Sequence, residues 1–456
     1  MRPKPTMHGV QESDGSVVPT KSPNNVAPAT AEVAEGRDPA KGNEVEQNVA
    51  RTQRRTPTPR ALDRVREAAR KDKKVRFTAL FHHVDLDRLH TAYQALKRKA
   101  AAGVDGVTWA DYSEGLEARL VDLHARLHRG AYRAKPSRRV HIPKPDGRKR
   151  PLGIASLEDK IVQRAVVEVL NAVYEADFVG FSYGFRPERS QHHALDALAT
   201  GILRKRVNWV LDADIRGFFD AIDHGWMVKF VEHRIADKRI TRLVKKWLAA
   251  GILEEGKWSS PVDGTPQGAT ISPLLANVYL HYVLDLWVEQ WRQRHARGDV
   301  VIVRYADDFV LGFQYEDDAR SLRRQLEDRL QRFHLELHPE KTRLFRFGKN
   351  ARRNQSERGL RKPTSFEFLG FTHICGKSRA GGFVLTRHSS KHRMRAKLQA
   401  VKVALRRRMH LRVRDQAVWL ASVVRGYFAY HAVPTNVRAL GAFRVQAVRQ
   451  DRKSVV

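Results

Sequence analysis

Hydrophobic and polar positions along the chain follow two periodicities. Short apolar runs predict β-strands at Trp209–Ala213, Val300–Arg304, Phe309–Phe313 and Phe366–Phe371. Apolar residues three and four positions apart predict helices, which we expect from Val84 to Leu96, over Tyr112–His128, over Ser389–Arg414 and over Trp419–Tyr430. Because strands and helices do not alternate regularly, the pattern favours an α+β core followed by a smaller helical domain.

A helix start is predicted at Ser156, where Asp159 follows with the spacing of a capping box. The helix that follows carries apolar residues along one face, at Ile161, Val162, Ala165, Val166, Val169 and Leu170. Residues 1–75, by contrast, have no sustained apolar period and are rich in proline, threonine, asparagine, glycine and charge. We expect them to form a disordered basic leader.

The charge balance indicates a polyanionic partner. The 456 residues include 84 Lys and Arg against 50 Asp and Glu, a formal net charge of +34. A surface that repels itself this strongly is best explained by nucleic acid that neutralises it. We expect no membrane partner, because there is no lipidation motif and the apolar segment Ile271–Val288 is interrupted by Asn277, His281 and Asp285.

Cysteine usage indicates a reducing compartment. Cys375 is the single cysteine, which excludes an intramolecular disulfide and any zinc site built on cysteine pairs. The first residues lack the apolar stretch of a signal peptide, so we expect a cytoplasmic protein.

Two adjacent acids stand between two predicted strands, in Tyr305-Ala306-Asp307-Asp308. Alone, this arrangement fits an ordinary turn, because aspartate favours turns. A second acidic site follows another predicted strand, where Asp212 and Asp214 lie two residues apart on one face. Two-metal phosphoryl transfer needs carboxylates from separate strands. Asp214 at a strand end and Asp307 at a hairpin tip meet this need, with Asp212 as an alternative to Asp214.

Seven motifs follow one another along the chain: Gly103–Thr108 (GVDGVT), His141–Gln163 (HIPKPDGRKRPLGIASLEDKIVQ), Tyr183–Ser190 (YGFRPERS), Gly264–Leu275 (GTPQGATISPLL), Tyr305–Asp308 (YADD), His338–Thr342 (HPEKT) and Phe366–Phe371 (FEFLGF). In this order they resemble the reverse transcriptases of group II introns, also called intron maturases. Ala269 replaces a glycine that is usual in that family. The resemblance implies a right-hand polymerase fold, with fingers and palm over residues 76–375 and an α-helical thumb and maturase domain over residues 385–450.

The resemblance also implies catalytic residues. Asp214, Asp307 and Asp308 correspond to the family's catalytic triad and would hold two Mg²⁺ ions, with the Ile215 carbonyl as a further metal contact. Lys341 corresponds to a lysine that protonates the leaving pyrophosphate, a general-acid role.

Four further residues correspond to the nucleotide-binding site of the family. Lys144 and Arg150 would grip the incoming triphosphate, for which a pair of cations is suited. Phe219 would lie below the sugar and select deoxynucleotides, and Gln267 would line the pocket for nucleotide and template.

The function implied is that of an RNA-directed DNA polymerase that copies intron RNA from a DNA or RNA primer with dNTPs, and that binds intron RNA to assist splicing. Two alternatives remain: a splicing cofactor that only binds RNA, and a domesticated reverse transcriptase in phage defence or CRISPR spacer capture. Trp419–Tyr430 either contacts RNA through its aromatic rings or forms a core helix. We expect a shortened maturase domain, because the chain stops at Val456, and no endonuclease of the type that carries cysteine pairs.

Overall fold

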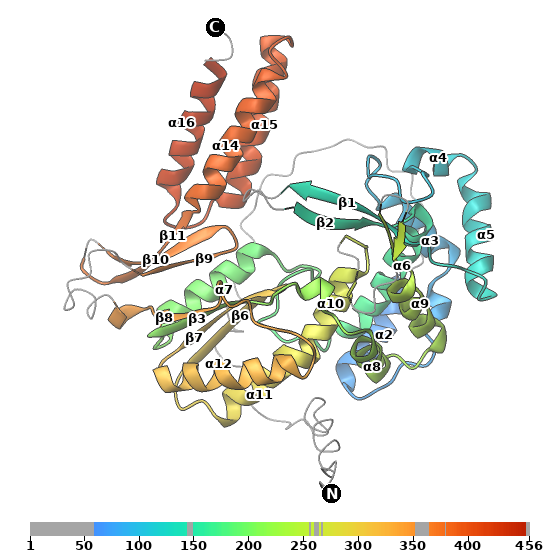
Figure 1. Ribbon diagram of the computed structural model, residues 1–456, viewed down its shortest axis with the longest axis horizontal. Helices are drawn as coiled ribbons and strands as arrows, with labels where there is room; N and C mark the ends of the chain where they lie inside the picture. Colours follow the sequence, from blue (N-terminus) through green and yellow to red (C-terminus); the bar gives the residue numbers. More distant parts are fainter. Residues whose placement is uncertain are drawn as a thin grey trace, which may run out of the picture. The chain divides into compact units, whose positions relative to one another are not determined.

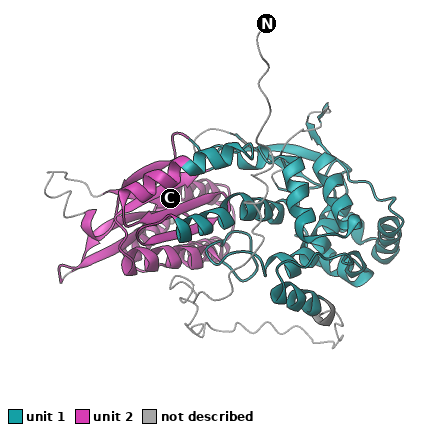
Figure 2. Ribbon diagram, turned by 90° about the horizontal axis from the view of Figure 1, so that it is seen from below, with its two compact units in different colours: residues 1–189, 215–294, 325–338 teal, residues 190–214, 295–324, 339–456 magenta. Residues whose placement is uncertain are grey.

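The computed structural model describes residues 59–143, 149–254, 257–259, 264–265, 268–351, 364–378 and 380–452. The chain folds into two compact units, each assembled from separate stretches of sequence (Figure 2). Unit 1 comprises residues 1–189, 215–294 and 325–338, and unit 2 comprises residues 190–214, 295–324 and 339–456. Helices and sheets occur in both units, in agreement with the predicted mixture of α and β structure.

The described part of unit 1 consists mainly of helices and includes a four-stranded sheet of order β2–β1–β4–β5 (Figure 1). The strands are β1 (Ser137–Pro143), β2 (Lys149–Ile154), β4 (Ile252–Glu254) and β5 (Lys257–Ser259). The helices are α2 (Pro59–Lys71), α3 (Leu86–Gln94), α4 (Trp109–Ser113), α5 (Leu116–His128), α6 (Leu157–Tyr174), α8 (His224–Arg234), α9 (Lys238–Ala249), α10 (Ser272–Leu280) and α11 (Leu286–Arg294), with short helical turns at η2 (Phe81–His83), η3 (Phe218–Asp220) and η4 (His281–Asp285). The helix α12 (Glu316–Gln331) begins in unit 2 and ends in unit 1.

Helix α6 begins where the sequence predicts. The Asp159 backbone N–H donates to Ser156 Oγ at 3.3 Å, which confirms Ser156 as the N-cap. All six apolar residues of the predicted face are buried. The Asp159 carboxylate accepts hydrogen bonds from the Ser156 and Tyr132 hydroxyls and from the Lys135 backbone, so it also ties the helix start to the preceding segment.

The predicted leader is wrong at its C-terminal end, because Pro59–Lys71 forms α2. In this helix Leu62, Val65 and Ala69 are buried, and α2 packs against α6. Their spacing of three and four residues gives α2 an apolar face. Because charged residues outnumber apolar ones in this segment, its composition alone did not indicate a helix with an apolar face. Residues 1–58 lie outside the described residues.

Two other predicted elements are interrupted by left-handed backbone. The helix expected over Tyr112–His128 is divided between α4 and α5 by Gly115, at φ 70°. The strand expected over Phe366–Phe371 is a hairpin, in which Leu369 at φ 48° and Gly370 at φ 82° separate β9 (Ser365–Phe368) from β10 (Phe371–Lys377). Such conformations terminate regular structure and favour glycine.

The described residues of unit 2 form two antiparallel sheets. The larger has the order β6–β7–β3–β8, from β6 (Val300–Tyr305), β7 (Asp308–Phe313), β3 (Trp209–Asp214) and β8 (Arg343–Arg346). Its first three strands confirm the predicted strands to within one residue at each end. The smaller has the order β11–β10–β9, with β11 at Phe383–Ser389. Helix α7 (Gln191–Arg204) packs on β6, where Gly201 allows close approach: a Cβ there would lie 2.5 Å from Val301 Cγ1.

Three C-terminal helices complete unit 2: α14 (Lys391–Arg406), α15 (Val413–His431) and α16 (Val437–Arg452) (Figure 1). They share a core of Leu398, Val401, Leu405, Leu420, Tyr427, Phe443 and Ala447. Trp419, Val423 and Phe428 pack against this core, so the apolar side chains of Trp419–Tyr430 support the core-helix interpretation. The first of the predicted basic helices ends at Arg406, eight residues before the expected Arg414.

The expected domain boundary at residues 375–385 lies inside unit 2, because β10 and β11 pair with each other across it. The ranges predicted for fingers and palm and for the thumb therefore do not coincide with these two units. Among the described residues, no helix has both the length and the apolar character needed to cross a bilayer.

Candidate active site

Strands β3 and β7 place Asp214 directly opposite Asp308. The strands are antiparallel, and residues facing each other in such a pair have Cβ atoms about 4.5–5.5 Å apart. The neighbouring Asp214 carboxyl is also one of the groups that raise the pKa of Asp308. Two of the three predicted catalytic acids, about 90 residues apart in the chain, thus meet at one end of the larger sheet of unit 2.

The third acid, Asp307, lies in the turn between β6 and β7. The ladder closes at Tyr305 and Asp308, which leaves Ala306 and Asp307 as the turn residues, with Ala306 left-handed at φ 58°. Arg304, which is fully buried, donates from Nη1 to the Ala306 carbonyl at 2.9 Å. Apart from Arg304, the flanking positions Val303, Phe309 and Val310 are apolar and buried, so the turn is fixed from both strands.

The protonation of Asp308 reflects its neighbours. Burial of the carboxyl, followed by the charges of Asp307 and Asp214, raises the pKa of Asp308 to about 7, and Lys341 opposes the shift. Part of the Asp308 residue nevertheless remains open to solvent. A cation placed among these acids would relieve their repulsion and favour the ionised form.

Strand β8 and the residues before it bring two cations to the acids. Lys341 Nζ donates to Asp214 Oδ2, and the Arg343 guanidinium donates from Nη2 to Asp212 Oδ2 at 3.1 Å. Burial raises the pKa of Asp212, although Arg343 opposes the shift. The acid left open as an alternative ligand, Asp212, is therefore held by an arginine, whereas Asp214 lies at the strand end with Lys341.

Two predicted site residues belong to unit 1. Ile215 is buried and forms an isolated bridge with Leu337. Phe219 lies on η3 and is half-buried, whereas its neighbour Phe218 is fully in the core. The Thr265 backbone N–H donates to the Phe219 carbonyl at 2.8 Å, so the GTPQG motif begins directly beside this turn. Of the two phenylalanines, Phe219 is thus the one accessible to a ligand.

The remaining nucleotide-binding predictions are only partly covered by the structure. The Arg150 backbone pairs with Ile142 in the β1–β2 hairpin, but its side chain lies outside the description. Lys144 and Gln267 lie outside the described residues.

The acids offer carboxylate oxygens, the ligands that Mg²⁺ prefers. Within the part of the chain that the structure covers, no three His, Cys, Asp or Glu side chains gather closely enough to form a metal site. The Asp214 and Asp308 pair supplies two such ligands and Asp307 is adjacent in sequence, so the donor chemistry fits a magnesium site that is completed when the ion binds.

Two site residues, Arg304 and Arg343, did not emerge from the sequence. Arg304 is the one charged residue in the apolar run Val300–Tyr305, and a charge in a buried strand was an available signal. Arg343 follows Lys341 by two residues, as Asp214 follows Asp212. That matched spacing becomes informative only once β3 and β8 are known to pair.

Comparison with known proteins gives the family of this chain. Residues 142–373 match the family model described as reverse transcriptase (RNA-dependent DNA polymerase). The chain belongs to the reverse transcriptase family. This reverse transcriptase match contains every predicted site residue from Lys144 to Lys341 and implies a polymerase fold with palm and fingers.

Individual relatives connect this reverse transcriptase to introns. The chain is 39% identical over 240 residues to Protein YkfC of Escherichia coli K12, covering 46% of the chain and 62% of that protein. It is 36% identical over 244 residues to the group II intron-encoded protein LtrA of Lactococcus lactis subsp. cremoris, covering 53% of the chain and 40% of that protein. A shorter match, 31% over 130 residues, links 28% of the chain to 18% of the mitochondrial nuclear intron maturase 3 of Arabidopsis thaliana. The chain thus spans less than two thirds of these relatives, and the resemblance to group II intron reverse transcriptases is confirmed.

Proposed function

We propose that this chain is the RNA-directed DNA polymerase of a group II intron, with Asp214, Asp307 and Asp308 as ligands of two Mg²⁺ ions. The observation that carries the proposal is the register of β3 and β7, which sets Asp214 opposite Asp308 beside the turn that holds Asp307. When bound, the ions supply activation of the primer 3′-hydroxyl and charge neutralisation at the pyrophosphate.

The chain's own residues act around the acids. The Ile215 carbonyl is a further metal contact in this proposal. Lys341, which lies within hydrogen-bonding reach of Asp214, would turn to the leaving pyrophosphate and donate the proton it needs. Lys341 has room for such a movement because 54% of its side-chain surface is exposed.

Nucleotide selection is assigned to unit 1. Phe219, accessible where Phe218 is not, would lie below the sugar and exclude a 2′-hydroxyl by its bulk. We assign the triphosphate to Lys144 and Arg150, whose charges suit phosphate oxygens, and the pairing nucleotide and template to Gln267.

A primer-extension assay on an RNA template with dNTPs and Mg²⁺ tests the proposal. We expect Asp307→Ala and Asp308→Ala to lower the extension rate by roughly a thousandfold or more, because each removes a metal ligand. Asp317→Ala is the matched control, since this acid of α12 is 81% exposed and lies outside the proposed site. Wild-type synthesis by either Asp307→Ala or Asp308→Ala would show that the assignment is wrong.

We further propose that residues 385–450 form the thumb and maturase segment, which binds intron RNA and assists splicing. The support is chemical: Asp415 is the one acidic residue between Lys391 and Gln450, against fourteen Lys and Arg. Splicing of the parent intron by the Asp307→Ala variant distinguishes the two roles. Splicing without copying indicates two separate functions, whereas a wild-type chain that splices but never copies indicates an RNA-binding cofactor.

A further inference from the structure

Two ion pairs join β3 to the start of β8 and to the residues just before it. Asp212 lies directly opposite Arg343 in the register, and the two side chains are joined at 3.1 Å. Two residues further along β3, Asp214 is joined to Lys341, which lies two residues before Arg343 because the strands are antiparallel. Since alternate residues of a strand share a face, the acids Asp212 and Asp214 lie side by side, about 7 Å apart along β3.

Only one of these acids has a part in the proposed chemistry. Asp214 lies opposite Asp308, whereas Asp212 lies opposite Val310. Asp212 is nevertheless a carboxylate next to the site, with 19% of its side-chain surface exposed against 14% for Asp214. An unpaired Asp212 would therefore attract the same cations as Asp214.

Arg343 is well placed to prevent this competition. Its guanidinium also lies 5.5 Å from the centre of the Phe345 ring, a contact on the same strand that restricts where the charge can go. Asp212 is repelled by Asp214 and by Glu367, and Arg343 is the cation that counters this repulsion. The arginine thus holds one acid of the row in a fixed ion pair.

We infer that Arg343 is a positioning residue, which occupies Asp212 so that Lys341 and the catalytic cations engage Asp214. This inference rests on the proposed function, because it deepens the role of the same acids. The sequence alternative of Asp212 as metal ligand is thereby replaced by a role for Asp212 as the anchor of Arg343.

The test uses the full chain, with Mn²⁺ as the probe and free Mn²⁺ measured by electron paramagnetic resonance without template or nucleotide. We expect Arg343→Met to bind Mn²⁺ roughly tenfold more tightly, since coupling between contacting residues commonly has this size and Asp212 becomes uncompensated. At saturating dNTP, primer extension by Arg343→Met should fall roughly tenfold, because Asp212 draws the ions away from Asp214. The KM for dNTP should stay within about twofold of the wild-type value.

Adding Asp212→Asn to Arg343→Met should reverse both changes, because the competing carboxylate is gone. Arg343→Lys should lie between wild type and Arg343→Met, since it keeps a charge without the planar fork. A purely structural role for Arg343 predicts altered thermal unfolding with unchanged Mn²⁺ affinity in the absence of substrate.

Three results would overturn the inference: unchanged Mn²⁺ binding in Arg343→Met, a fall in extension that Asp212→Asn does not reverse, or a fall that resides only in KM. If Arg343→Met does not fold, the other two variants test the inference. The double variant with Asp212→Asn must then bind Mn²⁺ as tightly as wild type does, and Arg343→Lys must bind Mn²⁺ more tightly than wild type does. If the intact chain fails to extend a primer, the proposed function fails. The Mn²⁺ affinities then still test the role of Arg343 separately.

Discussion

Two regions of unit 2 differ in whether their charged side chains have partners within the protein. In the sheet β6–β7–β3–β8, Asp212 is paired with Arg343, Asp214 with Lys341, and Arg304 with the carbonyl of its own turn. In the described parts of α14–α16, basic residues follow one another along the helices, and Asp415 and Asp451 are the acids. Each of these charged side chains in the sheet has a specific partner, whereas the basic residues of the helices together produce a positive potential over their surface.

The two regions also differ in how completely they bury apolar side chains. Every residue of β7 after Asp308 is buried. On the helices, Val413, Val418 and Val437 are 68%, 60% and 75% exposed. The sheet therefore holds its side chains in a fixed geometry, whereas the helices combine one modest core with an exposed surface that includes apolar side chains.

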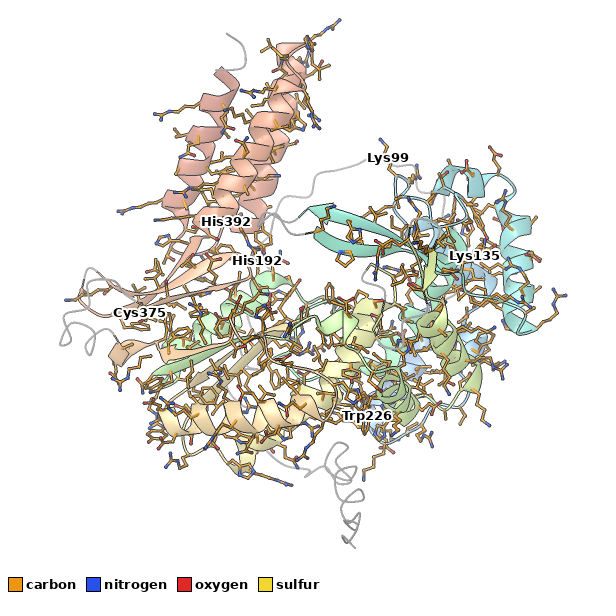
Figure 3. The ribbon with its side chains drawn as sticks, viewed as in Figure 1. Lys99, Lys135, His192, Trp226, Cys375 and His392 are labelled. Carbon is orange, nitrogen blue, oxygen red and sulfur yellow. The ribbon has the colours of Figure 1, made fainter. Side chains whose placement is uncertain are left out.

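The largest expected effect contrasts two glycines. Gly348 has φ 132°, and a Cβ there would lie 2.0 Å from the Val207 carbonyl oxygen. The Gly348 backbone N–H donates to the sulfur of the buried Cys375. Figure 3 labels this cysteine. Gly441, inside α16, has no atom within 4 Å of such a Cβ. We expect Gly348→Ala to lower the free energy of unfolding by at least about 3 kcal/mol, through strain and a backbone clash. Gly441→Ala should instead raise it by about 0.5–1 kcal/mol.

Chemical denaturation of both variants measures this contrast. Equal losses of stability would break the distinction between a rigid sheet and a tolerant helix surface. Circular dichroism of Gly441→Ala should show unchanged or increased helical signal, because alanine favours the helical backbone.

How far the sequence predicts these regions depends on whether the signal is local. The strands around YADD can be predicted from the sequence because their apolar runs are continuous. The helix start at Ser156 can be predicted because an N-cap acts within one turn. The acids of the site were found because each lies at the end of a strand or in the adjoining turn, and because the motif order resembles a family. These features need no knowledge of distant partners.

The missed features are non-local. Arg343 matters through its register with Asp212, 131 residues away. The Phe366–Phe371 run reads as one strand, since its apolar residues do not reveal that Leu369 and Gly370 turn left-handed. The apolar face of α2 is convincing only once α6 supplies a surface for Leu62 and Val65. Strand pairing and helix docking are thus decided by tertiary contacts.

The next expected effect contrasts a buried arginine with an exposed one. Arg304→Met should reduce primer extension by roughly a hundredfold, because Ala306 loses the donor that fixes the turn bearing Asp307. Arg425→Met on α15 removes an exposed guanidinium and should change extension by less than about twofold. The measurement is kcat and KM for dNTP, with the loss expected in kcat. A loss confined to thermal stability, with kcat intact, would argue against positioning of the turn by Arg304.

A moderate effect should appear in opposite pH dependences. Without metal, Asp308 has a pKa of about 7, above its ordinary value, so the folded state holds the proton more tightly and the sheet loses stability as pH rises from about 4 to 7. His431 on α15, whose pKa burial lowers to about 4, behaves in the reverse sense. The helices should gain stability as pH rises from about 4 to 6.5.

Hydrogen exchange of β7 and α15 amides between pH 4 and 8, corrected for the intrinsic pH dependence of exchange, separates the two trends. Asp308→Asn should flatten the trend of β7 alone, and Mg²⁺ should protect β7 more at pH 8 than at pH 5, because metal binds the ionised carboxylate. Parallel trends in both regions would indicate that one cooperative unit responds to pH.

The smallest expected effect tests whether unpaired charge on the helices behaves as a field. Arg406→Gln on α14 removes an exposed charge that forms no ion pair with the side chains that the structure describes, whereas Arg297→Gln removes an exposed arginine paired with Asp317 and Asp318. The logarithm of the affinity for RNA falls as the logarithm of the salt concentration rises. If Arg406 contacts phosphate, its loss should make this negative slope shallower by about 0.7–0.9. Arg297→Gln should leave the slope unchanged, because its charge is already neutralised within the protein. Binding titrations of a structured RNA at several salt concentrations measure both slopes. Equal changes would mean that pairing inside the protein does not determine which arginines reach RNA, and the contrast between the sheet and the helices would then rest on burial alone.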